Sequence, residues 1–237
     1  MRLRFTMLAV LGLFSAAQPA AAQTRRDSIT MVMMVSTPYG ALPLMVTPGM
    51  TSRKAPADDR FEMRYGRFTF DKVQTQAFAI GGRFGALGIG IGAEMCSDCS
   101  LTMMAGADYD APVVSYLFPR SAAPALFTVR LRPAVGFARP MSSVGVTIVS
   151  AAVDVPFALA FAVGEGQRAK LVPFIAPGFG GASAGGDGHH DSGMRGSLVL
   201  GAGLVDLVPG SALSFSARQI LLKGARITVG LGLTLGY

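Results

Sequence analysis

Charged and aromatic side chains are scarce in this sequence. Charged residues make up 15% of the 237 residues and apolar residues 51%, whereas about 25% charged is usual for a soluble domain. The chain therefore has more apolar surface than an ordinary soluble domain hides, and either a core or a lipid phase must take it up. Tryptophan is absent, so the candidates for an aromatic girdle at a membrane surface are Tyr39, Tyr65, Tyr109, Tyr116 and Tyr237.

Long basic runs are also missing. The formal net charge is +7, but no basic run exceeds two residues and the charges are dispersed along the chain. Nucleic-acid binding needs a basic stripe or patch, so we expect no nucleic-acid partner.

Residues 1–22 have the composition of a secretory signal peptide. Arg2 and Arg4 form a basic start, an apolar run covers residues 5–16, and small residues at 20–22 provide a cleavage site. An uncleaved anchor is the alternative, but the apolar run is shorter than the roughly 20 residues of a spanning helix. We expect cleavage near Ala22 and export of the mature chain.

The C-terminus alternates strictly between large apolar residues and glycine or threonine. The apolar positions are Ile227, Val229, Leu231, Leu233, Leu235 and Tyr237. A period of two predicts a β-strand with one wholly apolar face. In a membrane barrel that face meets lipid, and the small residues fill a narrow interior.

This ending resembles the last strand of the bacterial outer-membrane β-barrel family, and in particular of small OmpA/OmpX-like barrels. In that family the strand ends in an aromatic residue preceded by apolar residues at every second position. Here the matching positions are Val229, Leu231, Leu233, Leu235 and Tyr237. The resemblance implies that these residues form the signal recognised by the barrel-assembly machinery, and that the protein resides in the outer membrane.

Similar alternation recurs upstream, for example over residues 127–137 and 153–163, and turn signals separate the segments. We predict an all-β, antiparallel up-and-down transmembrane barrel of about 8 to 12 strands, with ten as the best count because even numbers are expected. The predicted strands are 60–71, 73–82, 84–94, 110–118, 125–138, 150–163, 168–179, 195–207, 211–222 and 225–237.

Residues 60–237 then form one barrel domain, which follows an N-terminal segment at 23–59. Residues 28–36 could supply a first strand, whereas residues 37–59 predict a loop or mobile segment because they are rich in proline, glycine and charge without periodicity. We expect short periplasmic turns and longer outer loops, one of them over residues 180–193.

A second organisation competes near residues 144–163, where a nearly continuous apolar run is long enough for a transmembrane helix. Asp154 and Pro156 near its middle, its many valines and its later alternation favour a strand.

Cys96 and Cys99 form a C-x-x-C pair. In an oxidising compartment a loop disulfide is favoured, over a redox pair or a zinc site, because the only histidines lie far away in the sequence. We expect no metal and no cofactor.

Two further motifs lie in the glycine-rich stretch. His189 and His190 with flanking aspartates could bind a metal weakly, but an exposed polar loop is favoured. The residues around Ser183 match G-x-S-x-G, a nucleophile elbow that requires a strand-to-helix turn. Glycines follow Ser183 and disfavour a helix, so we expect no enzyme.

Several charges fall on inward positions of the predicted strands, namely Arg130, Arg132, Asp154, Arg195 and Arg218. They either pair with one another in a filled lumen or line water that would favour anions. Pairing is favoured because a barrel of this size leaves little interior room.

The sequence thus predicts a monomeric outer-membrane barrel with a structural or small passive-pore role, in contact with lipid and the assembly machinery. Two alternatives stay open. One is a lipid-modifying barrel enzyme that uses Ser183 and a nearby histidine, and the other is a soluble periplasmic barrel that binds an apolar ligand.

Overall fold

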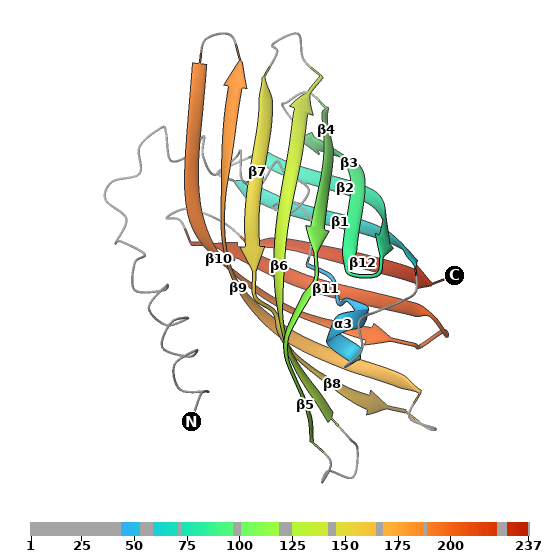
Figure 1. Cartoon of the computed structure of the whole chain (residues 1–237). Coiled ribbons are helices and arrows are strands. Elements are labelled where there is room, and N and C mark those ends of the chain that lie inside the picture. The colour runs from blue at the N-terminus through green and yellow to red at the C-terminus, as the bar shows by residue number, and fades with distance from the viewer. Residues whose placement is uncertain are drawn as a thin grey trace, which may run out of the picture.

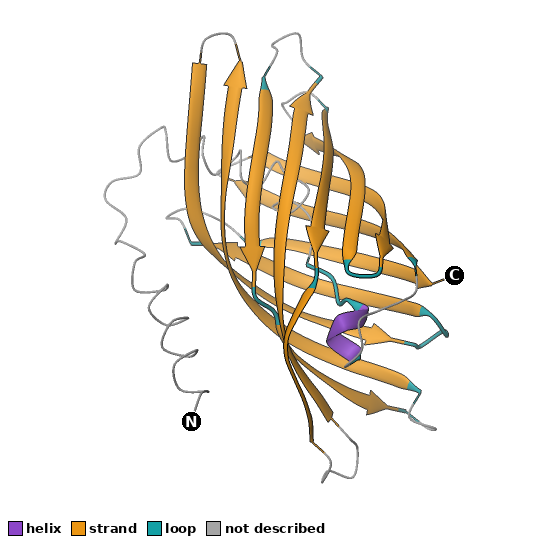
Figure 2. Ribbon diagram, viewed as in Figure 1, coloured by secondary structure: helices purple, strands orange, loops and turns teal. Residues whose placement is uncertain are grey.

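The computed structural model describes residues 44–52, 59–70, 73–96, 101–118, 125–141, 146–164, 168–186, 189–221 and 227–236. Antiparallel strands make up almost all of these residues (Figures 1 and 2). Within these ranges, no helix has the length and apolar character needed to cross a bilayer. The fold is all-β, as the alternating sequence predicts.

The strands follow one another with short connections. Their bounds are β1 Arg60–Phe70, β2 Val73–Phe84, β3 Leu87–Cys96, β4 Thr102–Tyr109, β5 Ala111–Phe118, β6 Ala125–Pro140, β7 Thr147–Asp154, β8 Phe157–Val163, β9 Ala169–Gly186, β10 His189–Val205, β11 Ser211–Ile220 and β12 Thr228–Gly236. A single turn of helix, α3, covers Pro48–Thr51.

These strands close into a ring with ten positions. β1 pairs with β12, so that the first and last strands join the two ends of the sheet. β5 continues β4 after Asp110, and β8 continues β7 after residues 155 and 156, because both halves pair along the same neighbour, β6. Pro156 has no N–H for the ladder and explains the second break.

Side chains alternate between the two faces of the wall. On β12, Thr228, Gly230 and Thr234 are buried, whereas Val229, Leu231 and Leu235 are exposed. The same parity holds on β6, where Arg130 and Arg132 are buried and Val135 and Phe137 point outward and are exposed. The apolar face therefore lies outside and the polar face inside, as predicted for a barrel in lipid.

The predicted strands agree with this ring except at three places. Residues 102–109 form β4, which the sequence prediction omitted because Gly106 and two adjacent methionines obscure its alternation. The single strand predicted at 150–163 is instead two strands, β7 and β8, and no helix is present over residues 146–163.

The third difference is the predicted outer loop at 180–193, which is wrong. β9 and β10 continue through it as a paired hairpin up to Gly186 and His189. The glycine-rich sequence is nevertheless held extended, because β9 pairs with β7 up to Gly185 and β10 pairs with β9 from His189 onward. At this end of the barrel only residues 187 and 188 separate the described parts of β9 and β10.

The exposed apolar wall leads to a testable prediction. Leu200 points outward from the middle of β10 and is 54% exposed. We expect Leu200→Arg to lower the free energy of unfolding in lipid vesicles by about 2–4 kcal/mol, since an arginine there would meet hydrocarbon. Urea titration measures the change, with Leu200→Met as the matched control. Equal stability of the arginine variant and wild type would contradict a lipid-facing wall.

Candidate functional site: a closed lumen

A network of buried charges occupies the inner wall on β1, β2, β4 and β6. The carboxylate of Asp108 lies 2.8 Å from Arg83 Nη2 and 2.7 Å from Arg132 Nη2. Glu62 lies 2.7 Å from Arg83 Nε and 2.6 Å from Arg64 Nη2. Arg83 and Asp108 each expose only 1% of their side chains. The network therefore links strands across the inside of the wall.

Gly88 on β3 makes room for this network, because β3 lies between the strands that carry the charges. A Cβ atom added to Gly88 would collide with Asp108 and with the guanidinium of Arg83. The glycine is therefore needed at this inward position, and any larger residue would displace the ion pair.

Two further ion pairs are buried. Arg130 Nε lies 2.8 Å from Asp110 Oδ1, and Arg218 Nη2 on β11 lies 2.8 Å from Asp154 Oδ2 on β7. β7 and β11 are not neighbours in the sheet, so the second pair reaches across the interior. Charges inside a low-dielectric interior are tolerated when paired in this way.

Residues 44–52, here called the plug segment, lie inside the barrel. Met45, Val46, Thr47 and Met50 are each at most 2% exposed. Residues 44–47 have no regular structure and Pro48–Thr51 form a single helical turn, in agreement with the predicted loop. Their burial was not predicted, because only the closed barrel provides the site that encloses them. Residues 37–43 and 53–58 of the predicted loop lie outside the described residues.

The plug segment is held by polar contacts to the wall. The Val46 amide donates to Ser214 Oγ at 3.1 Å, and Thr47 Oγ1 donates to Asp110. Arg132 donates to the Met45 carbonyl at 3.3 Å, and Arg130 donates to the Gly49 carbonyl at 3.3 Å. The same arginines that bind the buried aspartates thus also satisfy backbone carbonyls of the plug segment.

Wall glycines accommodate the plug segment. A Cβ atom added to Gly232 on β12 would collide with Met45, and one added to Gly203 on β10 would collide with Val46. The small residues on the inward face of the last strand therefore leave room for the plug segment of the same chain.

Apolar side chains fill much of the remaining interior in two clusters. One gathers toward the ends of β1, β9 and β11 and consists of Phe68, Ala77, Ala79, Met104, Ala138, Ile148, Ala182 and Ile220. The other packs Leu44, Val46 and Met50 of the plug segment against inward residues of β6, β8, β9, β10 and β11. The charge pairs and both clusters together make this lumen a packed interior.

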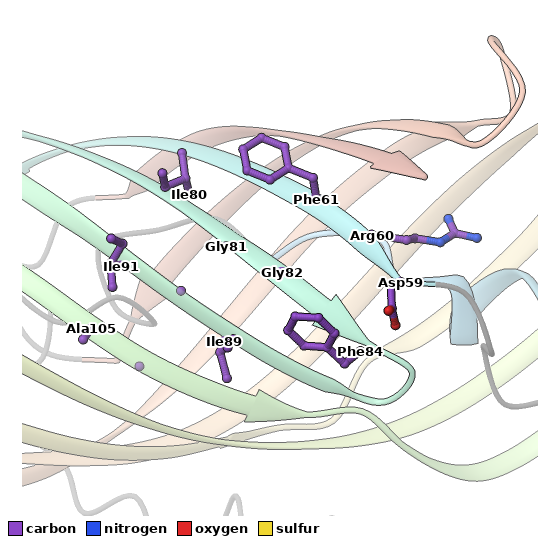
Figure 3. A pocket seen from close by; sticks show the side chains of 12 residues that line it. Asp59, Arg60, Phe61, Ile80, Gly81, Gly82, Phe84, Ile89, Ile91 and Ala105 are labelled. Carbon is purple, nitrogen blue, oxygen red and sulfur yellow. The ribbon is translucent and has the colours of Figure 1, made fainter. Parts of the chain in front are cut away.

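A depression with a volume of about 470 Å³ lies on the outer wall. Figure 3 shows Phe61, Ile80, Phe84 and Ile89 around it, with Arg60 and Asp59 at one end. Gly82 also lines it. Its lining is almost wholly apolar, which suits contact with a lipid chain better than chemistry.

The structure brings four of the five predicted inward charges into buried ion pairs: Arg130, Arg132, Asp154 and Arg218. The fifth, Arg195, lies half-buried at an inward position of β10, where its Nη1 donates to the Met194 carbonyl at 2.7 Å.

The remaining predicted residues lie on β3 and β12 or outside the described residues. Cys96 ends β3, but Cys99 lies outside the described residues, so the disulfide stays a prediction. Val229, Leu231, Leu233 and Leu235 lie on the outward side of β12, whereas Tyr237 is also outside the described residues. Their role as an assembly signal stays a prediction.

Ser183 lies within β9, paired with Ser192 of β10, and not on a strand-to-helix turn. The nucleophile-elbow geometry is therefore absent at Ser183. His189 and His190 begin β10 instead of standing in a loop, opposite Gly186 and Gly185.

Five of the residues that build the interior were not selected from the sequence: Glu62, Arg64, Arg83, Asp108 and Asp110. The first two alternate with Phe61, Met63 and Tyr65 on β1. This alternation predicts that Glu62 and Arg64 point inward, so the sequence does carry a signal for them. Asp110 lies at the break between β4 and β5, where alternation gives no parity.

The ladders and the filled lumen define a closed, up-and-down antiparallel β-barrel with its apolar face outside. No protein-family model and no curated protein matches the chain.

Two solved structures similar to this chain are crystal structures of Ail, the attachment invasion locus protein of Yersinia pestis. One is in complex with the heparin analogue sucrose octasulfate. Each match covers 76% of this chain and 95% of Ail, with TM-scores of 0.38 and 0.32 and identities of 15% and 14%. At these values the comparison identifies no function.

The ion pair between Asp154 and Arg218 gives a second prediction. Arg218→Met leaves a buried carboxylate without this cation, and Asp154→Leu leaves the guanidinium without this carboxylate. We expect each to lower the free energy of unfolding by about 3–5 kcal/mol, and the double variant to recover more than half of that loss. Urea titration in vesicles measures all three.

The matched control is Arg67→Met, which removes an exposed arginine hydrogen-bonded to Gln74 and should change stability by less than about 0.5 kcal/mol. Additive losses in the double variant would show that the two charges do not stabilise each other.

Proposed function

We propose that this chain is an outer-membrane barrel with a structural, non-conducting role in the cell envelope. The observation that carries the proposal is the combination of an apolar outer wall with a lumen filled by the chain's own plug segment. The wall suits lipid, and the assembly machinery would act on the C-terminal strand. The ring uses every described strand within one chain, which is consistent with a monomer.

The filled lumen argues against a passive pore. Conduction needs a continuous polar path wide enough for a hydrated solute. Here Met45 and Met50 are fully buried in the interior, and the guanidinium groups of Arg130 and Arg132 are engaged by carboxylates and plug carbonyls. An anion would have to displace those contacts to pass.

The other two alternatives have less support. A soluble apolar-ligand binder would need its large apolar residues inside, whereas Leu200, Phe215 and Leu231 are half exposed on the outside. A lipid-modifying enzyme would need an activated Ser183, whose position within a strand pair lacks the elbow turn.

Conductance distinguishes the structural role from a pore. We expect wild-type protein in planar lipid bilayers to give no stable single-channel steps, because the plug segment and the ion pairs fill the lumen. A general porin measured in the same bilayers controls for insertion and detection. Reproducible ohmic steps from the wild-type protein would overturn the non-conducting role and leave the membrane location intact.

Location and assembly are tested separately. We expect the protein in the outer-membrane fraction, and we expect unboiled samples to migrate as a compact species on detergent gels. Deletion of Tyr237 should reduce the compact fraction several-fold, since it removes the terminal aromatic residue of the proposed assembly signal.

Tyr109→Ala is the matched control, because it removes an outward, half-exposed tyrosine from a different strand. A protein recovered in the soluble periplasmic fraction, indifferent to loss of Tyr237, would contradict the proposed location.

A further inference from the structure

β5 differs from the other strands because one of its two edges has no strand partner along its whole length among the described residues. Among the described residues it pairs only with β6. The β3 ladder stops opposite β4, at the pair of Leu87 with Tyr109, so β5 extends past the turn between β2 and β3. Figure 1 shows β5 projecting from the ring together with β8.

Both faces of β5 are apolar and open. Tyr116, Val114 and Phe118 are 54%, 41% and 45% exposed, and Val113 and Leu117 on the other positions are 54% and 37% exposed. Neighbouring β6 is covered on its inner face, where Leu126 and Thr128 are buried. The exposure therefore belongs to β5 itself and to its unoccupied side.

An edge of this kind is unfavourable in or beside a membrane. Each unpaired backbone N–H or C=O group in hydrocarbon costs several kcal/mol, and in water an apolar edge is a template for another strand. β5 lacks the features that normally protect an edge, because it carries no charge and its one proline, Pro112, lies at a register shift near its start. A further strand along this edge would remove both costs.

We propose that residues 28–36 of the same chain pair antiparallel with the free edge of β5. Their sequence, Ser-Ile-Thr-Met-Val-Met-Met-Val-Ser, contains no charge, proline or glycine and is rich in β-branched residues. It has nine residues for the eight of β5. The proposal rests on the membrane location in the proposed function, but not on the absence of conduction.

The position of the plug segment fixes the direction. Thr47 contacts Asp110, which directly precedes β5. A strand antiparallel to β5 ends beside Asp110, at the place where the chain must enter the lumen. The intervening residues 37–43 can span up to about 25 Å, which is enough to connect that end to buried Leu44.

A second copy of the chain is a poorer occupant. Antiparallel pairing of two β5 edges requires a twofold axis perpendicular to the sheet. Such an axis would point the C-terminal ends of the two barrels toward opposite faces of the bilayer. Proteins assembled from one side share a single orientation, so the edge is better matched by a segment of its own chain.

Disulfide trapping in the full chain tests this pairing. In a background of Cys96→Ser and Cys99→Ser, cysteine replaces Val32 or Met33 together with Val114, Ser115 or Tyr116. The matched control combines Val32→Cys with Val135→Cys, on a strand paired on both sides. After mild oxidation of membranes, non-reducing gels and mass spectrometry of tryptic peptides identify the links.

We expect an intrachain link for at least one β5 combination and none for the control. Links only between two chains, or no β5 link in protein that still migrates as the compact barrel species, would overturn the pairing. In the second case the compact species would show that the barrel itself is intact.

Hydrogen exchange supplies a second measurement. Deletion of residues 28–36 should increase amide exchange in Val113–Phe118 by about tenfold or more, because half of those amides would lose their partners. Exchange in β12 should be unchanged. Equal exchange of the β5 amides with and without residues 28–36 would also overturn the proposal.

Discussion

The backbone ladder between β1 and β12 is the contact on which the rest of the structure depends. It joins the two ends of a sheet whose other neighbours are consecutive in the chain. Closure satisfies the backbone groups of both terminal strands, which a surrounding lipid phase could not do. It also separates an outside that can be wholly apolar from an inside in which charges can be enclosed.

The interior shows how such enclosed charges are tolerated. Asp108 is surrounded by arginines from β2 and β6, and Asp154 is paired with Arg218 across the lumen. Arg130 and Arg132 contact both carboxylates and plug carbonyls. The plug segment and the charge network are therefore coupled, because the same two arginines bind carboxylates and carbonyl groups of the plug segment. Loss of either partner would leave buried polar groups of the other without hydrogen bonds.

Most of the fold was predictable because a barrel wall imposes a period of two on each strand that separates lipid from lumen. β6 and β12 illustrate this, since their alternating positions give both the strand and its inward charges. β4 was missed where small and flexible residues weaken the pattern, and the hairpin of β9 and β10 was mistaken for a loop. Glycine there reflects tight packing, as at Gly178, where an added Cβ would collide with Asp154.

The sequence by itself determined which face of the wall is apolar, because side-chain parity is a local property of an extended chain. It also indicated that Arg130, Arg132, Asp154 and Arg218 point inward. Only the tertiary structure decided their partners and the location of residues 44–52. Those contacts join positions far apart in the chain, and which inward groups meet depends on strand register and on the space that Gly88, Gly203 and Gly232 leave inside the closed ring.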